Sequence, residues 1–265
     1  MKRIALLIAA SALCSFVFAQ DWAKTQVDAS PRHLEWVELK HGARTVKAFV
    51  AYPEVKDKAP VIVLIHEIFG LSDWAMLMAD QLAGAGYIVV APDFLSGKGP
   101  SGGGTASLDA GAIRTAMGEL TPDGVDADLH AAVDYAKKIP AGNGKVVVGG
   151  FCWGGAQTFR FVTKRTDIAA ALVFYGNGPT DEADLKKINC PVYGFYGEND
   201  QRVNATIPEI EKIMKANGKT FEPIIYTGGG HGFMRAGIQP GATEGNAKAR
   251  AEGWKRVMAI MGGLK

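Results

Sequence analysis

Apolar runs alternate with amphipathic stretches along most of the chain, which predicts strands separated by helices. Residues 34–39 and 45–52 alternate between apolar and polar positions, as an antiparallel pair at a sheet edge does. The run 60–66 is continuously apolar, which is typical of a strand buried on both faces. Further strands are expected at 87–91, 145–150, 168–175, 191–196 and 221–226, and helices at 72–83, 108–118, 123–138, 153–164, 181–187, 205–217 and 243–261.

This order of elements predicts an α/β fold with a mostly parallel central sheet, flanked by helices on both faces. We expect one domain over 34–265. Right-handed crossovers place the C-terminal ends of parallel strands at one rim of the sheet, where ligands bind. Two segments are expected to be loose: the polar N-terminal extension 20–33, and the Gly- and Ser-rich surface loop 96–107.

The first 19 residues have the pattern of a secretory signal peptide. Lys2 and Arg3 precede an apolar stretch from Ile4 to Phe18, and small residues stand where a signal peptidase cleaves, after Ala19. The alternative is a membrane anchor, but the stretch is shorter than the ~20 residues that a spanning helix needs. We therefore expect a secreted or periplasmic protein with no membrane association after cleavage.

Composition narrows the classes of function. Of the 265 residues, 48% are hydrophobic and 21% charged, which is typical of a globular protein with a sizeable core. The net charge is +2, and no basic run is interleaved with aromatic residues, so no nucleic-acid partner is expected. Neither an H-E-x-x-H motif nor paired C-x-x-C motifs occur, so no metal site is expected.

Cys152 and Cys190 remain after removal of the signal peptide, and an oxidising compartment would favour a disulfide between them. Cys152 follows one strand and Cys190 precedes another. In a parallel sheet these positions are about 20 Å apart, whereas a disulfide requires Cα atoms within ~7 Å. We expect no disulfide, and interpret Cys190 as a small buried apolar residue.

The segment from Val146 to Gly155 places Cys152 in a G-x-C-x-G-G turn between a strand and a helix. This context predicts a nucleophile elbow with cysteine in place of serine. Gly150 and Gly154 allow the close backbone approach that such a strained turn needs. A helix N-terminus also favours the thiolate. The alternative is a packed cysteine without chemistry.

A nucleophilic thiol needs a base, and the base needs an acidic residue to orient it. His231, in a glycine-rich loop after the last strand, is the only histidine that follows Cys152. Asp200 follows the strand between them and is preferred to Glu198 as the acid. The sequence thus predicts the triad Cys152–Asp200–His231, the alternative being a turn aspartate and a surface histidine. His66, which precedes the nucleophile, is given at most a supporting role.

Backbone and pocket groups complete the predicted site. The backbone N–H groups of Ile68 and Trp153 are expected to form the oxyanion hole. Tyr175 and Phe233 are expected to line a substrate pocket, although such aromatic residues are more often part of the core.

Two charged residues have alternative interpretations. Glu67 directly follows a central strand, where it either regulates the ionisation of Cys152 or pairs with a basic residue such as Arg235. Arg235 lies four residues after His231, where it either grips a substrate carboxylate or forms a surface salt bridge.

Five segments together resemble the dienelactone hydrolase family over roughly residues 45–262: 66–70 (HEIFG), 91–93 (APD), 150–155 (GFCWGG), 197–200 (GEND) and 230–235 (GHGFMR). The resemblance implies an α/β-hydrolase fold without a large lid domain, and activity on lactones or esters without a cofactor. It assigns Cys152 as nucleophile, His231 as base and Asp200 as the orienting acid. It places Glu67 beside the thiol and makes Arg235 an anchor for a substrate carboxylate.

The chain departs from that family at one place. The best-known members carry a second arginine shortly after the Pro-Asp segment, where this chain has Phe94 to Lys98 and no arginine. This argues against a small dicarboxylate-like lactone. We expect a small-molecule ester or lactone, with or without a carboxylate, cleaved through an acyl-enzyme. The alternatives are a non-catalytic binding protein on the same fold and a thioesterase or acyltransferase.

Overall fold

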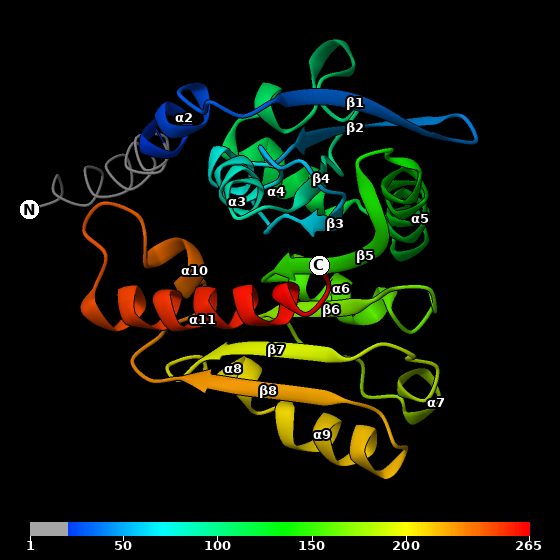
Figure 1. The fold of residues 1–265 in the computed structure, drawn as a ribbon, viewed down its shortest axis with the longest axis vertical. Helices are drawn as coiled ribbons and strands as arrows, with labels where there is room; N and C mark the ends of the chain where they lie inside the picture. The colour runs from blue at the N-terminus through cyan, green and yellow to red at the C-terminus, as the bar shows by residue number, and fades with distance from the viewer. Residues whose placement is uncertain (1–20) are drawn as a thin grey trace, which may run out of the picture.

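A single eight-stranded sheet runs through the computed structural model, which describes residues 21–265 (Figure 1). The expected signal peptide and its cleavage site after Ala19 lie outside the described residues. The strands are β1 (Leu34–His41), β2 (Arg44–Ala51), β3 (Ala59–Ile65), β4 (Ile88–Pro92), β5 (Gly142–Phe151), β6 (Ala170–Phe174), β7 (Val192–Gly197) and β8 (Phe221–Tyr226). Their order across the sheet is β1-β2-β4-β3-β5-β6-β7-β8.

The sheet is mostly parallel, as expected. β1 and β2 form an antiparallel pair at one edge, and β2 also runs antiparallel to β4. All other neighbours are parallel, so β3, β5, β6 and β7 end at the same rim. Every residue of β3, β4 and β6 is buried, which explains why these runs lack polar alternation.

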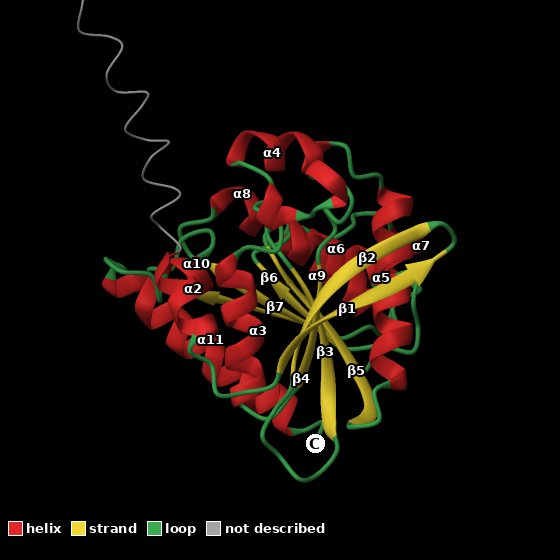
Figure 2. Ribbon diagram, turned by 90° about the horizontal axis from the view of Figure 1, so that it is seen from above, coloured by secondary structure: helices red, strands yellow, loops and turns green. Residues whose placement is uncertain are grey.

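Helices cover both faces of the sheet (Figure 2). One face packs on α2 (Asp21–Asp28), α3 (Asp73–Gly84), α10 (Phe233–Ala236) and α11 (Glu244–Gly262). The other packs on α5 (Pro122–Lys138), α6 (Trp153–Phe161), α7 (Glu182–Leu185) and α9 (Ile207–Ala216). The remaining helices are α4 (Ala110–Gly118), α8 (Gln201–Asn204) and the 3-10 turns η1 (Pro100–Gly102) and η2 (Thr105–Ser107).

The N-terminal extension is not loose, contrary to expectation. Residues 21–28 form helix α2, whose Ala23 and Val27 are buried against the core. After this helix, Ser30 and Arg32 both bind the carboxylate of Asp80 on α3: Ser30 Oγ at 2.6 Å and Arg32 Nε at 2.7 Å. Asp80 is 2% exposed, so the extension supplies the partners of a buried charge.

The segment 96–107 is not a floppy loop either. The buried carboxylate of Asp93 accepts hydrogen bonds from the backbone N–H of Leu95 and from both the backbone N–H and the hydroxyl of Thr105. The hydroxyl of Thr105 in turn accepts from the backbone N–H of Leu71, 3.0 Å away. Gly104 is required by this packing, since a Cβ on it would lie 2.2 Å from the Asp93 carboxylate.

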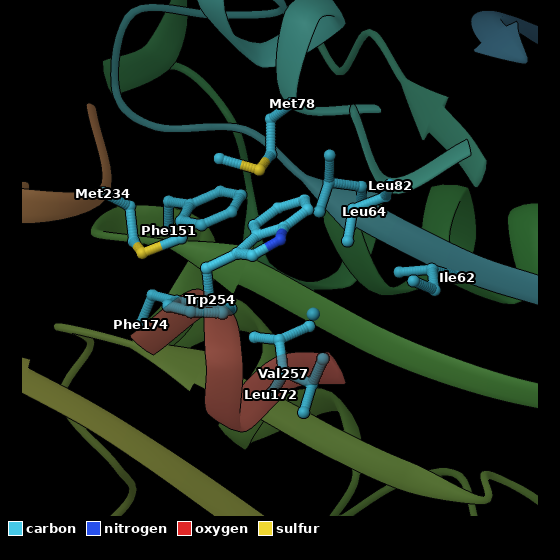
Figure 3. A pocket seen from close by; sticks show the side chains of 11 residues that line it. Ile62, Leu64, Met78, Leu82, Phe151, Leu172, Phe174, Met234, Trp254 and Val257 are labelled. Atoms are coloured by element: carbon cyan, nitrogen blue, oxygen red, sulfur yellow. The ribbon is translucent and has the colours of Figure 1, made fainter. Parts of the chain in front are cut away.

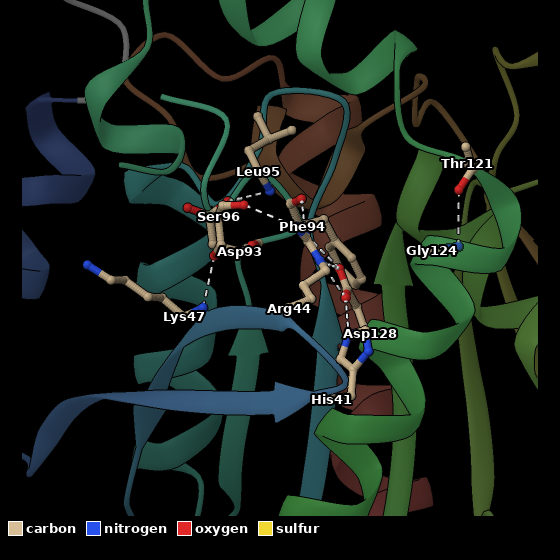
Figure 4. A network of polar contacts seen from close by, with 10 residues as sticks. All are labelled: His41, Arg44, Lys47, Asp93, Phe94, Leu95, Ser96, Thr121, Gly124 and Asp128. Atoms are coloured by element: carbon tan, nitrogen blue, oxygen red, sulfur yellow. Dashed lines mark hydrogen bonds and ion pairs between the residues drawn. The ribbon is translucent and has the colours of Figure 1, made fainter. Parts of the chain in front are cut away.

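A polar network holds the start of this segment to the sheet (Figure 4). Ser96 donates to the backbone carbonyl of Asp93 and accepts from the N–H of Lys47. Arg44 binds the carbonyls of Phe94 and Ser96 and the buried carboxylate of Asp128. The β1–β2 edge is thus tied to the 94–96 segment.

A small void lies in the core between the sheet and helices α3 and α11 (Figure 3). Its volume is about 10 Å³, and its lining is apolar and includes Phe151, Met234 and Trp254. An apolar space of this size has no partners for a water molecule. Across residues 21–265, no helix is both long and apolar enough to cross a membrane.

Candidate active site

Cys152 sits at the turn between β5 and α6, in a backbone conformation unusual for a residue with a side chain. Its φ is 56° and its ψ is −113°, and it occupies the N-cap position of α6. The neighbouring glycines are required: a Cβ on Gly150 would lie 2.3 Å from the carbonyl oxygen of Gly154, and one on Gly154 would lie 2.4 Å from that of Ile65. This is the strained strand–turn–helix geometry that the sequence predicts.

Three side chains from three strand ends meet at this turn. Nε2 of His231 lies 3.1 Å from Sγ of Cys152, and Nδ1 of His231 lies 2.5 Å from Oδ2 of Asp200. Glu198 turns away and accepts a hydrogen bond from the backbone N–H of Gly228. The structure therefore brings together the three residues of the expected triad, with Asp200 rather than Glu198 on the imidazole.

The electrostatics of the trio favour a protonated imidazole. The hydrogen bond to the Cys152 sulfur, followed by that to Asp200, raises the pKa of His231 to about 9, against the opposing effect of partial burial. Asp200 is 6% exposed, so its charge acts on the imidazole with little screening by water. At neutral pH a proton on His231 stabilises negative charge on the sulfur.

Glu67 and Arg235 form an ion pair beside this trio. Nε of Arg235 donates to Oε2 of Glu67 over 2.8 Å, and the guanidinium lies over the ring of Phe69 at 5.2 Å. The Glu67 side chain is 4% exposed and that of Arg235 23%. Burial raises the pKa of the Glu67 carboxyl, and Arg235 opposes that rise. The pairing expected as one alternative for both residues is therefore present.

Tyr175 and Phe233 do not line an open pocket, which corrects the expectation from sequence. They are 1% and 0% exposed, and their rings pack edge to face at 5.5 Å. The ring of Tyr175 also packs against that of His231 at 5.2 Å. Tyr175 thus packs against the imidazole and Phe233 packs against Tyr175, and both side chains are too buried to offer surface to a ligand.

The loop after β3 lies against the elbow. His66 is buried, its Nδ1 lies 2.7 Å from the carbonyl oxygen of Glu67, and its ring stacks on that of Trp153 at 5.6 Å. Burial lowers the pKa of His66, so the imidazole is neutral and structural. Ile68 follows in this loop with a side chain that is 46% exposed, and Trp153 opens helix α6.

The sequence did not predict that the 96–107 segment supports the loop beside the nucleophile. Gly70 closes the turn that carries Glu67 and Ile68, and a Cβ there would lie 2.3 Å from the hydroxyl of Thr105. Thr105 therefore joins the 96–107 segment to the loop beside the nucleophile. Asp93 in the Pro-Asp segment could have indicated this contact, because a buried aspartate at the end of a strand needs hydrogen-bond donors from a neighbouring segment.

The described part of the chain contains no cluster of three or more His, Cys, Asp or Glu side chains suited to a metal ion. Cys152 and Cys190 are both free. Cys190 is 7% exposed, and burial raises the pKa of its thiol to about 12. Of these two thiols, only that of Cys152 is both accessible and paired with a base.

Comparisons with known proteins identify the family of the chain. The model of the dienelactone hydrolase family matches residues 46–264. A Methylorubrum extorquens protein named carboxymethylenebutenolidase is 31% identical over 227 residues, which cover 80% of this chain and 75% of that protein. Protein usf of Aquifex pyrophilus is 32% identical over 206 residues, covering 76% and 87%.

Solved structures show the same architecture. A dienelactone hydrolase-like promiscuous phosphotriesterase from metagenomic libraries superposes with a TM-score of 0.72 at 23% identity, covering 88% of this chain and 98% of that one. At this identity the likeness concerns the fold alone. The family model spans nearly all of the described residues, and the chain belongs to the dienelactone hydrolase family, a family of ester and lactone hydrolases.

Proposed function

We propose that the protein hydrolyses a carboxylic ester or lactone through a covalent acyl-cysteine intermediate, with Cys152, His231 and Asp200 as the catalytic residues. The observation that supports this most strongly is the pair of contacts made by His231, to the sulfur on one side and to Asp200 on the other. The strained φ of Cys152 supports it further, because backbone strain of this kind clusters at functional sites.

In the first half of the reaction, the sulfur of Cys152 attacks the carbonyl carbon while His231 holds the thiol proton on Nε2. The carbonyl oxygen becomes an oxyanion, for which we propose the backbone N–H groups of Trp153 and Ile68 as donors. His231 then gives its proton to the leaving alkoxide as the C–O bond breaks. In a lactone this alkoxide stays attached to the acyl group.

In the second half, water attacks the thioester and His231 takes its proton. The C–S bond breaks, the acid leaves, and the sulfur regains its place beside the imidazole. Asp200 fixes the ring so that Nε2 faces the sulfur, and it stabilises the imidazolium in both halves. Its burial makes this stabilisation larger than that of an exposed carboxylate.

Hydrolysis of a neutral activated ester, 4-nitrophenyl butyrate, tests the mechanism. We expect Cys152→Ala to lower kcat by at least about a thousandfold, as removal of a nucleophile does in other triads. Cys190→Ala is the matched control, because it removes the other free thiol from a buried place away from His231. Intact-mass measurement after rapid acid quenching should show one butyryl adduct in the wild type and none in Cys152→Ala. Retention of turnover in Cys152→Ala would exclude the mechanism.

The acid is tested by a second matched pair. Asp200→Asn should lower kcat strongly because the amide favours the wrong tautomer of His231. Glu198→Gln removes a carboxylate two residues away that binds only backbone, and it should have little effect on kcat. A larger loss in Glu198→Gln than in Asp200→Asn would show that the acid is misassigned.

We propose that Arg235 favours substrates with a carboxylate near the scissile bond. Only its Nε binds Glu67, and its two terminal nitrogens make no hydrogen bond to any residue in the described range. These two donors match a carboxylate. Arg235→Ala should raise KM for the mono-4-nitrophenyl ester of glutaric acid and leave KM for neutral 4-nitrophenyl butyrate unchanged. An equal rise for both esters would refute the anchoring role.

We also propose that Glu67 regulates the ionisation of Cys152. Glu67 is buried beside the trio and interacts electrostatically with His231. Glu67→Gln should alter the pH dependence of Cys152 alkylation by iodoacetamide and lower kcat. A purely structural ion pair with Arg235 would instead lower the melting temperature and leave the alkylation profile unchanged.

Export to the periplasm or outside the cell remains our proposal for the location. It is supported by the apolar stretch that ends before Ala19 and by the small residues at the positions that a signal peptidase reads. The N-terminal residue of protein recovered from the exported fraction tests it. We expect a chain beginning at Gln20, and an intact N-terminus with cytoplasmic retention would contradict the proposal.

A further inference from the structure

The base of the proposed triad follows a loop that has no side chains of its own to hold it in place. Residues 228–230, which directly precede His231, are three consecutive glycines. Glycine has more backbone freedom to lose on folding than any other residue, so such a loop does not fix its own conformation. The imidazole must nevertheless meet Sγ of Cys152 at 3.1 Å and Oδ2 of Asp200 at 2.5 Å at the same time. Other elements must therefore hold the loop.

Two elements enclose the glycine loop so closely that side chains would not fit. The chain leaves β8, forms α10 and returns along the sheet as α11 (Figure 1). A Cβ on Gly245, in the first turn of α11, would lie 2.4 Å from the carbonyl oxygen of Gly228. A Cβ on Gly197, at the end of β7, would lie 2.6 Å from the carbonyl oxygen of Gly230. The loop is thus packed between the strand that leads to Asp200 and the start of α11.

Asn246, also in the first turn of α11, makes a hydrogen bond directly beside the base. Its Oδ1 accepts from the backbone N–H of Gly230, the residue before His231, over 2.8 Å. The Glu198 carboxylate also accepts from this loop, but at Gly228, two residues further from the imidazole. The side chain of Asn246 therefore fixes the backbone immediately before the base.

The helix itself does not account for an asparagine at this position. Asn246 is the third residue of α11, and its own N–H is already capped by the hydroxyl of Thr243. In a capping box this position holds Glu or Gln, whose side chain reaches back to the N-cap residue. Asparagine is a weaker helix former than either. The loop that it holds explains its presence better than the helix does.

We propose that Asn246 is a positioning residue, whose carboxamide holds the Gly230 backbone so that His231 faces Cys152 and Asp200 together. Asn246 acts through the imidazole, and its effect falls on the chemical step. A misplacement of about 1 Å in a catalytic group can cost a hundredfold in rate. This inference rests on the proposed role of His231 as the base.

Asn246→Leu and Asn246→Asp test the inference as a pair, because both keep the size of the side chain and only aspartate keeps an acceptor oxygen. With 4-nitrophenyl butyrate, Asn246→Leu should lower kcat roughly ten- to a hundredfold. KM should stay within about twofold of the wild-type value, because no group that binds the ester is removed. Asn246→Asp should recover most of the lost kcat. Asn246→Ala, which removes the acceptor without adding an apolar group, should behave like Asn246→Leu.

Asn143→Leu is the matched control. The carboxamide of Asn143 likewise accepts a backbone N–H, that of Lys145 at 3.0 Å, but it lies at the opposite end of β5 from Cys152. Its loss should lower the melting temperature and leave kcat at the wild-type value. A role of Asn246 in stability alone would give this same result.

Alkylation of Cys152 by iodoacetamide at neutral pH gives a readout that needs no ester hydrolysis. The sulfur bonds to the carbon that carried iodine, and iodide leaves. Asn246→Leu should slow this reaction, because a misaligned imidazolium stabilises less negative charge on the sulfur. In a His231→Ala background the same substitution should change the rate no further, since Asn246 acts through the imidazole.

Four results would overturn the inference. They are a kcat in Asn246→Leu within about twofold of wild type, an equal loss of kcat in Asn246→Asp or in Asn143→Leu, an alkylation rate that Asn246→Leu leaves unchanged, and a fall in that rate that persists without His231. If the wild type does not hydrolyse the ester, the proposed function fails. The alkylation rates then still decide whether Asn246 aligns the imidazole with the sulfur.

Discussion

The N-terminal strap, residues 29–33 with helix α2, should contribute strongly to stability through Arg32. Asp80 is 2% exposed in the middle of α3, and three atoms bind it: Ser30 Oγ, Arg32 Nε and Arg32 Nη2 at 2.5 Å. Arg32→Ala removes two of these donors and the only positive charge among them. Removal of one partner of a buried ion pair costs about 3–5 kcal/mol.

For a chain of this size, 1 kcal/mol corresponds to a shift in melting temperature of roughly 2–4 °C. Arg32→Ala should therefore lower the melting temperature by roughly 6–20 °C, with a matching loss in the free energy of unfolding from urea titration. Lys24→Ala is the control, because its ion pair with Asp28 is 59% and 60% exposed. An exposed pair of this kind contributes about 0–1 kcal/mol.

A further variant separates lost charge compensation from lost packing. Asp80→Asn in the Arg32→Ala background replaces the uncompensated carboxylate with a neutral amide, which is less unfavourable to bury. It should recover part of the lost stability. If Arg32→Ala is no more destabilising than Lys24→Ala, the argument that the strap neutralises a buried charge is wrong.

Three other outcomes follow from contacts in the structure. Thr105→Val keeps the shape of the side chain but removes the hydrogen bonds to Asp93 and Leu71, so urea titration should show a loss of about 2 kcal/mol; no loss would mean that the 96–107 segment is not held as described. Gly154→Ala places a Cβ against the backbone of Ile65 and should sharply reduce the melting temperature and the yield of folded protein. Gly262→Ala is the control, because its Cβ would have no atom within 4 Å, and it should be neutral or stabilising by up to about 1 kcal/mol. The pKa of His231 is raised from 6.5 to about 9, so the stability that its charge adds is full below pH 6.5 and lost as pH rises through 9. The difference in unfolding free energy between wild type and Cys152→Ala should fall over that window, and a rise there would contradict the assigned cause.

The sequence predicted the fold well because buried strands and amphipathic helices differ in period. β3 was expected at 60–66 and is found at Ala59–Ile65, and the antiparallel edge pair was also expected. The short helices α8 and α10 were missed because they directly follow Asp200 and the glycine-rich segment of His231, which were interpreted as loops, whereas α7, which is equally short, was expected at 181–187. The elbow glycines were interpreted correctly, since steric crowding at such a turn leaves a readable pattern.

The errors came from tertiary partners. Residues 20–33 are polar, and nothing local shows that Ser30 and Arg32 meet a carboxylate about 50 positions away. Glycine and serine in 96–107 suggest flexibility, but close packing against Asp93 at Gly104 and against Ser107 at Gly99 and Gly103 also favours glycine. Exposure of Tyr175 and Phe233 was likewise decided by how β6 and α10 pack, which no pattern within either segment records.

The void between the sheet and helices α3 and α11 has a consequence for how this chain can diverge. Two of its walls, Phe151 and Met234, are chain neighbours of the nucleophile and of the segment that holds the base. Side chains that fill or enlarge this space would shift those backbones slightly without replacing any group that meets the substrate. Substitutions that line the void can thus adjust the alignment of the sulfur and the imidazole without contacting the substrate. A well-packed core elsewhere would not tolerate the same changes in apolar volume.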